Sequence, residues 1–233
     1  MHITLPNKQE ENPSTITGLP PPSSEQEPKH FKKITIDGLE GVGKSTLITA
    51  LLKYAVDTSS GGVPNEVLPP SIMNITELQR GTDDEQTKIS FWEYSYTHDR
   101  IGPIIYDKAR ILLYCFSLDF MGSVEYHLEV LQWKLEGLCS PGFPAEIGMP
   151  IFMVGCRSDS QNPETIAGRA RAKLYAQSID LDGYFECSAV TGEGVPELLD
   201  AILGIVLSPE KYTPRRHLWT KKNGRKNHRC VVL

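Results

Sequence analysis

The stretch Gly38-Leu39-Glu40-Gly41-Val42-Gly43-Lys44-Ser45 decides the fold class of this chain. It matches the pattern G-x-x-x-x-G-K-[ST] of a phosphate-binding loop. Residues 31–37 before it hold a short β-branched run, which predicts a buried strand. Apolar residues after it recur at helical spacing over about 45–55. A strand, a glycine-rich loop and a helix therefore follow one another directly, which is the context that this motif needs.

The residue types of this loop predict nucleotide chemistry. Glycines let the backbone close around phosphate oxygens, and the N–H groups at a helix start supply positive potential. Lys44 is predicted to reach the β- and γ-phosphates and to act in catalysis, and Ser45 to ligate Mg²⁺. The predicted nucleotide-binding residues of the loop are Glu40, Gly41, Val42, Gly43, Lys44, Ser45 and Thr46. The motif indicates a nucleoside triphosphate without choosing the base or the reaction; the alternative is a glycine turn that binds nothing.

Composition favours one folded domain with appendages. Of 233 residues, 39% are apolar and 23% charged, which argues against a disordered chain or a rod. Residues 1–30 contain six prolines and four glutamates, so we expect a disordered arm there. We place the folded domain at 31–210 and a basic tail at 211–233. No apolar run is long enough to span a bilayer, and the first residues do not resemble a signal peptide, so we expect an intracellular protein. The five cysteines lack a Cys-x-x-Cys pair, so we expect reduced thiols.

The rest of the folded part predicts an α/β sheet. A polar stretch at 58–70 is expected to be a loop, and 71–78 and 87–92 to form a hairpin. Later strands at 111–117, 151–154 and 184–188 alternate with helical patterns, which is typical of a parallel sheet with crossover helices. We therefore predict a mostly parallel six-stranded sheet with one antiparallel edge hairpin and helices on both faces.

Two later segments resemble the nucleotide-binding motifs of the small GTPases of the Ras superfamily. They are Val154-Gly155-Cys156-Arg157-Ser158-Asp159 and Glu186-Cys187-Ser188-Ala189-Val190-Thr191-Gly192-Glu193-Gly194-Val195. The resemblance implies the P-loop NTPase fold of small G-protein type, with GTP or GDP and Mg²⁺ as ligands. By the same resemblance, the Asp159 carboxylate would accept hydrogen bonds from guanine, and the backbone at Ser188 and Ala189 would contact the guanine carbonyl.

Other features resemble the Rho branch of that superfamily. They are Trp92, the run Cys115-Phe116-Ser117-Leu118, and the terminal Cys230-Val231-Val232-Leu233. A C-a-a-X box that ends in Leu predicts geranylgeranylation of Cys230. Residues 160–185 are too short for the extra helix that Rho proteins insert there, so the Rho resemblance is weaker than the superfamily resemblance.

The charge of the tail agrees with a lipid anchor. Residues 215–233 carry seven basic and no acidic side chains, which leaves 17 basic against 29 acidic in the rest. One lipid chain binds a membrane only marginally, and basic residues supply the second signal. We therefore expect a lipid-anchored protein at the cytoplasmic face of a membrane, the plasma membrane by preference. A nuclear-localisation tail and a solvated basic end are the alternatives. The acidic body is not expected to bind nucleic acid.

Departures from the family pattern concern hydrolysis. Small GTPases carry Asp-x-x-Gly followed by Gln after the third strand, where this chain reads Trp92-Glu93-Tyr94-Ser95-Tyr96-Thr97-His98. Glu93 is expected to act on Mg²⁺ through water, and Thr97 takes the catalytic position of the Gln that orients the attacking water. Tyr96 stands at the Gly position. Glu40 replaces a Gly beside the γ-phosphate, where a carboxylate would repel phosphate charge. We expect slow hydrolysis.

Two further departures concern binding. The guanine motif has Cys156 for the usual Asn or Thr and Arg157 for the usual Lys, which predicts reduced affinity for the base. The magnesium ligand of the first switch loop is either Asn65 or Ser71, depending on how the loop is aligned.

Three functions remain open from the sequence. The leading one is a membrane-anchored GTP/GDP switch whose loops at about 58–71 and 93–103 are ordered by nucleotide for effector proteins, with an exchange factor or an activating protein as further partners. The second is a non-hydrolysing scaffold. The third is a nucleoside monophosphate kinase, because residues 36–47 also resemble the loop of thymidylate kinases and Asp99-Arg100 would suit a substrate.

Overall fold

A computed structural model describes residues 31–57, 73–80, 87–94, 102–119, 124–138 and 149–212 of the chain. The predicted arm at 1–30, most of both switch loops and the tail beyond 212 lie outside these ranges. The first elements are β1 (Phe31–Asp37), α1 (Lys44–Asp57), β2 (Met73–Arg80), β3 (Thr87–Tyr94), α2 (Gly102–Tyr106) and β4 (Ala109–Ser117). They are followed by α3 (Val124–Leu138), β5 (Ile151–Cys156), α4 (Pro163–Ser178), β6 (Gly183–Cys187), α5 (Val195–Leu207) and the 3₁₀ helix η2 (Pro209–Lys211).

The strands form one six-stranded sheet in the order β2-β3-β1-β4-β5-β6. β2 pairs with β3 antiparallel, and every other neighbouring pair is parallel. In the centre, Ile34 of β1 lies opposite Phe91 of β3 and Ile111 of β4. The predicted sheet with one antiparallel edge hairpin is therefore confirmed. β3 runs to Tyr94, two residues beyond its predicted end, so Glu93 belongs to a strand.

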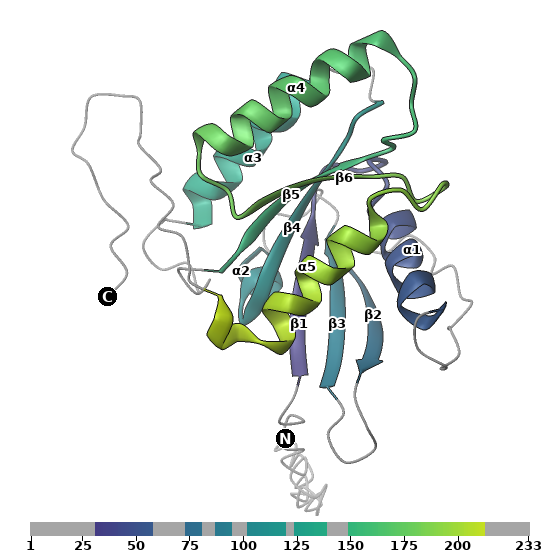
Figure 1. Cartoon of the computed structure of the whole chain (residues 1–233). Helices are drawn as coiled ribbons and strands as arrows, with labels where there is room; N and C mark the ends of the chain where they lie inside the picture. The colour runs from purple at the N-terminus through teal and green to yellow at the C-terminus, as the bar shows by residue number, and fades with distance from the viewer. Residues whose placement is uncertain are drawn as a thin grey trace, which may run out of the picture.

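Both faces of the sheet are covered by helices, as Figure 1 shows, with α1 and α5 on one side and α3 and α4 on the other. Successive side chains of a strand point to opposite faces, so each strand feeds two cores. Ile34 and Ile36 of β1 belong to the core under α1 and α5. Tyr114 and Phe116 of β4 belong to the core under α2, α3 and α4. Parallel sheets need this double cover because their strands are apolar on both faces.

The short helix α2 was not predicted, because its first residues were expected to end the loop at about 93–103. Its carbonyl groups are held by side chains distant in sequence. The Lys33 ammonium donates to the carbonyl oxygens of Ile104 (2.7 Å) and Asp107 (3.0 Å), and the Thr35 hydroxyl donates to that of Ile105 (2.7 Å). Such long-range partners leave no local signal in the sequence.

None of the helices within the described ranges has both the length and the apolar character that crossing a bilayer requires.

Candidate functional site

The loops that follow β1, β5 and β6 meet at one edge of the sheet, the edge formed by the carboxyl ends of its parallel strands. Ligands of open α/β sheets bind at this edge. The Arg157 guanidinium donates a hydrogen bond to the carbonyl oxygen of Gly41 over 2.9 Å, which ties the loop after β5 to the phosphate-binding loop. The Ser158 N–H donates to the carbonyl oxygen of Cys187 over 3.2 Å, which ties it to β6. The structure thus joins the three segments that the sequence predicts to bind nucleotide.

The phosphate-binding loop is built as its motif predicts. Gly41 and Gly43 have φ angles of 76° and 109°, a region that favours glycine. Val42 is buried in the core and anchors the loop. Lys44 opens α1, and its ammonium donates to the carbonyl oxygens of Gly38 (3.0 Å) and Leu39 (2.8 Å). The loop therefore curls around the lysine that the motif assigns to the phosphates.

Gly38 is required where the loop leaves β1. Its φ angle is 143°, and a Cβ atom at this position would overlap the carbonyl oxygen of Cys115 in β4. A glycine lets the loop pass this close to the neighbouring strand.

The two predicted magnesium-shell residues lie together. The Ser45 hydroxyl donates to Oε1 of Glu93 over 2.7 Å, from the first turn of α1 to the end of β3. Hydroxyl and carboxylate oxygens are ligands that Mg²⁺ prefers, and Mg²⁺ is commonly held by one or two protein groups plus phosphates. Across the described residues, no group of three or more His, Cys, Asp and Glu forms a metal site. Ser45 and Glu93 fit a magnesium ion that is shared with a phosphate ligand. Thr97, Asn65 and Ser71 lie outside the described residues.

At the other end of the site, Asp159 is exposed in the loop after β5. Ser188 is buried after β6, and its N–H donates to the carbonyl oxygen of Glu193 over 2.9 Å. Its own carbonyl oxygen accepts from the N–H of Gly192 over 2.9 Å. Ala189 is half-buried beside it. This closed turn fixes the backbone at the two residues predicted to contact a base. In Figure 1 it extends to the right-hand edge of the molecule.

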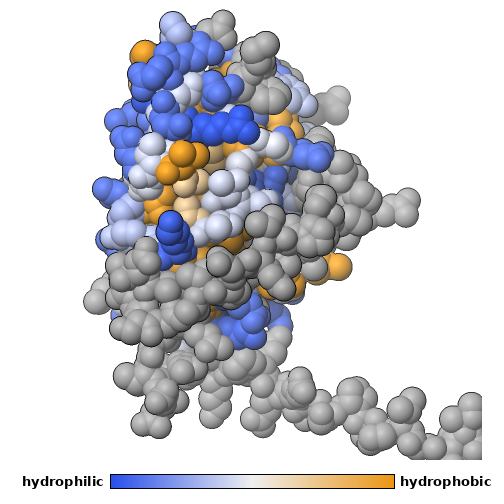
Figure 2. All heavy atoms as spheres, turned by 90° about the vertical axis from the view of Figure 1, so that its right-hand side faces the viewer, coloured by the Kyte–Doolittle hydropathy of each residue, from blue (hydrophilic) through white to orange (hydrophobic). Residues whose placement is uncertain are grey.

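Seen from that side, Figure 2 shows weakly polar and apolar surface at the middle of the face, bordered above by strongly hydrophilic residues.

A match to a known family shows which family this chain belongs to. The model of the Ras family matches residues 33–208. This chain belongs to the Ras family. Its relatives include the GTP-binding protein RHO1 of Candida albicans, 29% identical over 217 residues that cover 87% of this chain and 96% of that protein. The GTP-binding protein RHO1 of Saccharomyces cerevisiae is 29% identical over 219 residues, covering 87% and 95%. The predicted likeness to the Rho branch is thereby confirmed.

A solved structure agrees on the fold. Methanosarcina barkeri Roco2 RocCORdC, a structure bound to GDP, superposes with a TM-score of 0.51 at 16% sequence identity. The match covers 78% of this chain, which spans about half the length of that one. It supports the small G-protein type of fold that the sequence predicts.

In this Ras-family chain, side chains of α4 and β6 hold the loop after β5 in place, and the sequence did not predict these contacts. Arg169 of α4 donates to the carbonyl oxygen of Ser158, and its Nε lies 3.5 Å from Oε2 of Glu186. The Tyr184 hydroxyl donates to Oε1 of the same glutamate over 2.7 Å. Burial and the Glu186 carboxylate raise the pKa of Tyr184, which keeps the hydroxyl protonated as a donor. An arginine inside a helix carries no motif that would have revealed this role.

The three described cysteines of this Ras-family chain are free and buried under the site. The hydrogen bond to Cys156, together with burial, raises the pKa of the Cys115 thiol. Burial raises the pKa of Cys187 to about 12. Nucleophilic chemistry needs the thiolate, so Cys115 and Cys187 pack rather than react. Cys156 lies against Gly43, whose Cβ position would be 3.4 Å from the Cys156 Cβ.

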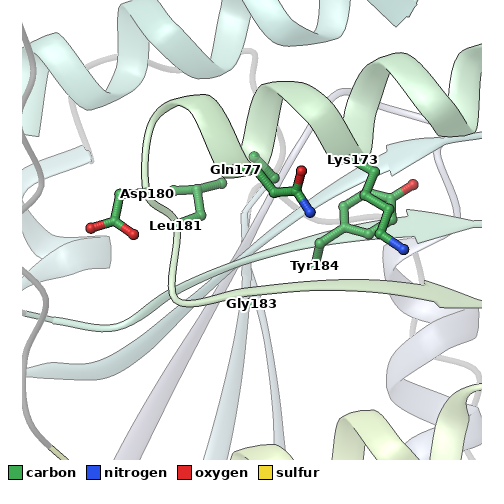
Figure 3. Close-up of a pocket in the computed structure, with 7 residues that line it drawn as sticks. Lys173, Gln177, Asp180, Leu181, Gly183 and Tyr184 are labelled. Atoms are coloured by element: carbon green, nitrogen blue, oxygen red, sulfur yellow. The ribbon is translucent and has the colours of Figure 1, made fainter.

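A separate pocket lies between α4 and the beginning of β6 (Figure 3). It is lined by Lys173, Ala176, Gln177, Asp180, Leu181, Gly183 and Tyr184. These residues belong to the last turns of α4, the turn after it and the start of β6, whereas the loops described above follow the carboxyl ends of β1, β5 and β6. The pocket is therefore not part of the candidate site.

Asp37, the residue just before the phosphate-binding loop, was not among the predicted site residues. It is fully buried and contacts α2 and α3 as well as the loop. The available signal was a carboxylate at the end of a strand predicted to be buried, since charged groups are almost never buried without a partner.

Proposed function

We propose that this chain is a Rho-like small GTP-binding protein that binds GTP and GDP with Mg²⁺ and hydrolyses GTP slowly. The observation that carries the proposal is the hydrogen bond from Arg157 to the Gly41 carbonyl oxygen. This bond links the phosphate-binding loop to the loop that carries the predicted guanine-reading carboxylate, which supports a single nucleotide site. The fungal Rho relatives that match nearly the whole length of their own chains are named GTP-binding proteins.

Each side chain has a role in this proposal. Lys44 binds the β- and γ-phosphates, and Asp159 accepts hydrogen bonds from guanine. Ser45 would hold Mg²⁺, with Glu93 acting on it through water; the bound ion would supply positive charge that offsets the charge of the phosphates. The buried turn at Ser188 keeps the backbone of Ala189 in place for the base.

Slow hydrolysis follows from what the chain lacks. Thr97 and Tyr96 stand where the family has the water-orienting Gln and the Gly that senses the γ-phosphate. Glu40 is exposed in the phosphate-binding loop, where its negative charge opposes that of the transferred phosphoryl group. The scaffold alternative rests on the same departures and predicts that nucleotide is held without turnover or is not bound at all. The kinase alternative is opposed by the match to the Ras family.

We further propose that the protein works as a switch on the cytoplasmic face of the plasma membrane. Geranylgeranylation of Cys230 and the basic residues upstream would supply the two signals that stable anchoring requires. Effector proteins would bind the nucleotide-ordered switch loops, and an exchange factor or activating protein would set the nucleotide state. A fluorescent fusion with Cys230→Ser should lose its membrane localisation while the unaltered fusion keeps it.

The deciding experiment is binding of labelled GTP, GDP and ATP to purified protein with Mg²⁺, followed by phosphate release over several hours. Guanine-selective binding with slow release supports the proposal. Binding with no release at all favours the scaffold. A preference for ATP, with transfer of phosphate to dTMP, would revive the kinase alternative and contradict the proposal.

A further inference from the structure

One face of the central strand β1 carries three buried polar residues in alternation: Lys33, Thr35 and Asp37. Burying such groups costs free energy unless they are hydrogen-bonded. Lys33 and Thr35 bind carbonyl groups of α2 and the residue after it, as described above. The ammonium of Lys33 also lies 4.0 Å from the centre of the Trp92 ring. Polar contacts therefore join α2 to β1, the strand that leads into the phosphate-binding loop. Of the three buried polar residues of β1, Asp37 lies next to that loop.

Asp37 has partners on three sides. Its Oδ1 accepts the N–H of Gly38 over 2.6 Å. The Lys134 ammonium of α3 lies 2.8 Å from Oδ1 and 2.6 Å from Oδ2, and the Tyr106 hydroxyl of α2 donates to Oδ2. The Asp37 side chain is not exposed at all and that of Lys134 is 8% exposed, so this is a buried ion pair. Burial and the Asp37 carboxylate raise the pKa of Tyr106, which keeps its hydroxyl protonated as a donor.

These contacts fix the first peptide of the phosphate-binding loop. Gly38 is held at its N–H by Asp37 and at its carbonyl oxygen by the Lys44 ammonium, over 3.0 Å. Lys44 is the residue that the proposed function assigns to the β- and γ-phosphates. A change in the position of Asp37 would therefore reach Lys44 through a single residue.

We propose that Asp37 and Lys134 are positioning residues for phosphate binding: Asp37 orients the peptide at Gly38, and Lys134 neutralises Asp37 so that the loop remains attractive to an anion. This inference rests on the proposed nucleotide binding. An isolated carboxylate beside the loop would oppose a negatively charged ligand, and burial weakens the screening of that repulsion by water. Lys134, which reaches the carboxylate from α3, removes the repulsion.

Stability alone does not account for the pair. Replacing a buried ion pair by well-packed apolar residues is often neutral or stabilising, whereas removing one partner is costly. An apolar residue at position 37 would nevertheless leave the Gly38 N–H without its acceptor. The carboxylate supplies that acceptor, and the pair with Lys134 makes its burial tolerable.

The test compares variants by titration of purified protein with labelled GDP and Mg²⁺, in which stoichiometry reports the competent fraction and Kd reports the site. Lys134→Met should raise Kd about tenfold or more, because a buried charge is left unpaired next to the loop. Asp37→Asn keeps an acceptor oxygen and removes the negative charge, so Kd should stay within about threefold of wild type or become lower. Lys173→Met, at an exposed lysine of α4, is the matched control and should change nothing.

Two double variants separate positioning from folding and remain informative if Lys134→Met fails to fold. Asp37→Asn with Lys134→Met keeps the acceptor and should bind GDP nearly as wild type does. Asp37→Leu with Lys134→Met removes the acceptor oxygen. The Kd for GDP should then rise about tenfold at unchanged stoichiometry, because the Gly38 N–H loses its partner. Equal Kd values in these two proteins, or losses confined to stoichiometry, would overturn the inference. A wild-type protein that binds no nucleotide would overturn the proposed function and this inference together.

Discussion

The hydroxyl of Ser45 donates a hydrogen bond to Glu93 over 2.7 Å, which joins the first turn of α1 to the end of β3. These residues were predicted separately, one from the phosphate-binding motif and one from its place after the third strand. Their contact shows that the Glu93 carboxylate reaches the serine of the phosphate-binding loop.

This contact predicts how nucleotide release depends on magnesium. Glu93→Ala should release labelled GDP about tenfold faster than wild type at millimolar Mg²⁺, because a charge-assisted contact of the proposed metal shell is lost. A chelator should then accelerate release from the variant much less than from wild type. Glu77→Ala removes an exposed glutamate on β2 that pairs with Lys88 and serves as the control. Equal responses of Glu93→Ala and wild type to the chelator would remove Glu93 from the metal shell.

The tether between Arg157 and Gly41 predicts a second effect on release. Arg157→Ala loses an exposed hydrogen bond of about 0.5–1.5 kcal/mol, so GDP should dissociate up to about tenfold faster. Arg157→Lys keeps a donor, so its rate of GDP dissociation should lie between those of Arg157→Ala and wild type. Fluorescent GDP chased with excess unlabelled GDP gives these rates. A rate for Arg157→Ala equal to that of wild type would show that the loops converge without this contact.

The proposed slow hydrolysis is expected to be reversible by substitution. Glu40→Gly removes a negative charge from the phosphate-binding loop, and Thr97→Gln supplies a side chain that can orient water. The double variant should hydrolyse bound GTP at least about tenfold faster than wild type in a single turnover, since one well-placed group is worth that much or more. GDP affinity serves as the control for Thr97→Gln, which should leave it unchanged. An unaltered rate in the double variant would mean that the second switch is aligned wrongly.

The strands along the chain and the phosphate-binding loop were predictable because their signals are local. A glycine motif between a β-branched run and an amphipathic helix needs no distant residue to be interpreted. Ser45, Lys44 and Asp159 followed from such motifs, and the structure places their loops at one edge of the sheet.

The supports of the site were not predictable, because they come from residues distant in sequence. Lys134 lies 97 residues from Asp37, and nothing in the local pattern of α3 distinguishes it from a solvated lysine. Arg169 likewise acts on Ser158 from the middle of α4. The helix α2 is held by side chains of β1, about 70 residues earlier, so its short sequence carries only part of the information that forms it.

Acid should destabilise this protein through His127. This histidine is buried in α3, with its ring 6.1 Å from that of Phe116, and burial lowers its pKa from the ordinary 6.5 to about 4. Between these values the unfolded chain binds a proton that the folded chain does not. Stability therefore falls as pH falls from about 6.5 to 4, with a slope from this residue of up to about 1.4 kcal/mol per pH unit.

Urea unfolding at a series of pH values measures that slope. His127→Gln cannot titrate, so its stability should depend less on pH over this range, whatever its absolute stability. Parallel curves for the two proteins between pH 4 and 6.5 would show that His127 is protonated equally in the folded and unfolded states.

Two glycines at and within α5 should respond to alanine in opposite directions. Gly194 caps the start of the helix with φ 72°, and a Cβ there would overlap the carbonyl oxygen of Glu186. Gly194→Ala should therefore lower the free energy of unfolding by about 2 kcal/mol or more and weaken GDP binding, because the turn at Ser188 and Ala189 must shift.

Gly204 lies inside the same helix with nothing within 4 Å of its Cβ position. Gly204→Ala should raise stability by about 0.5–1 kcal/mol and leave GDP binding unchanged, since alanine restricts the unfolded chain and favours helix. Urea unfolding of both variants checks the signs, and a Gly194→Ala protein as stable as wild type would contradict the tight approach of this turn to β6.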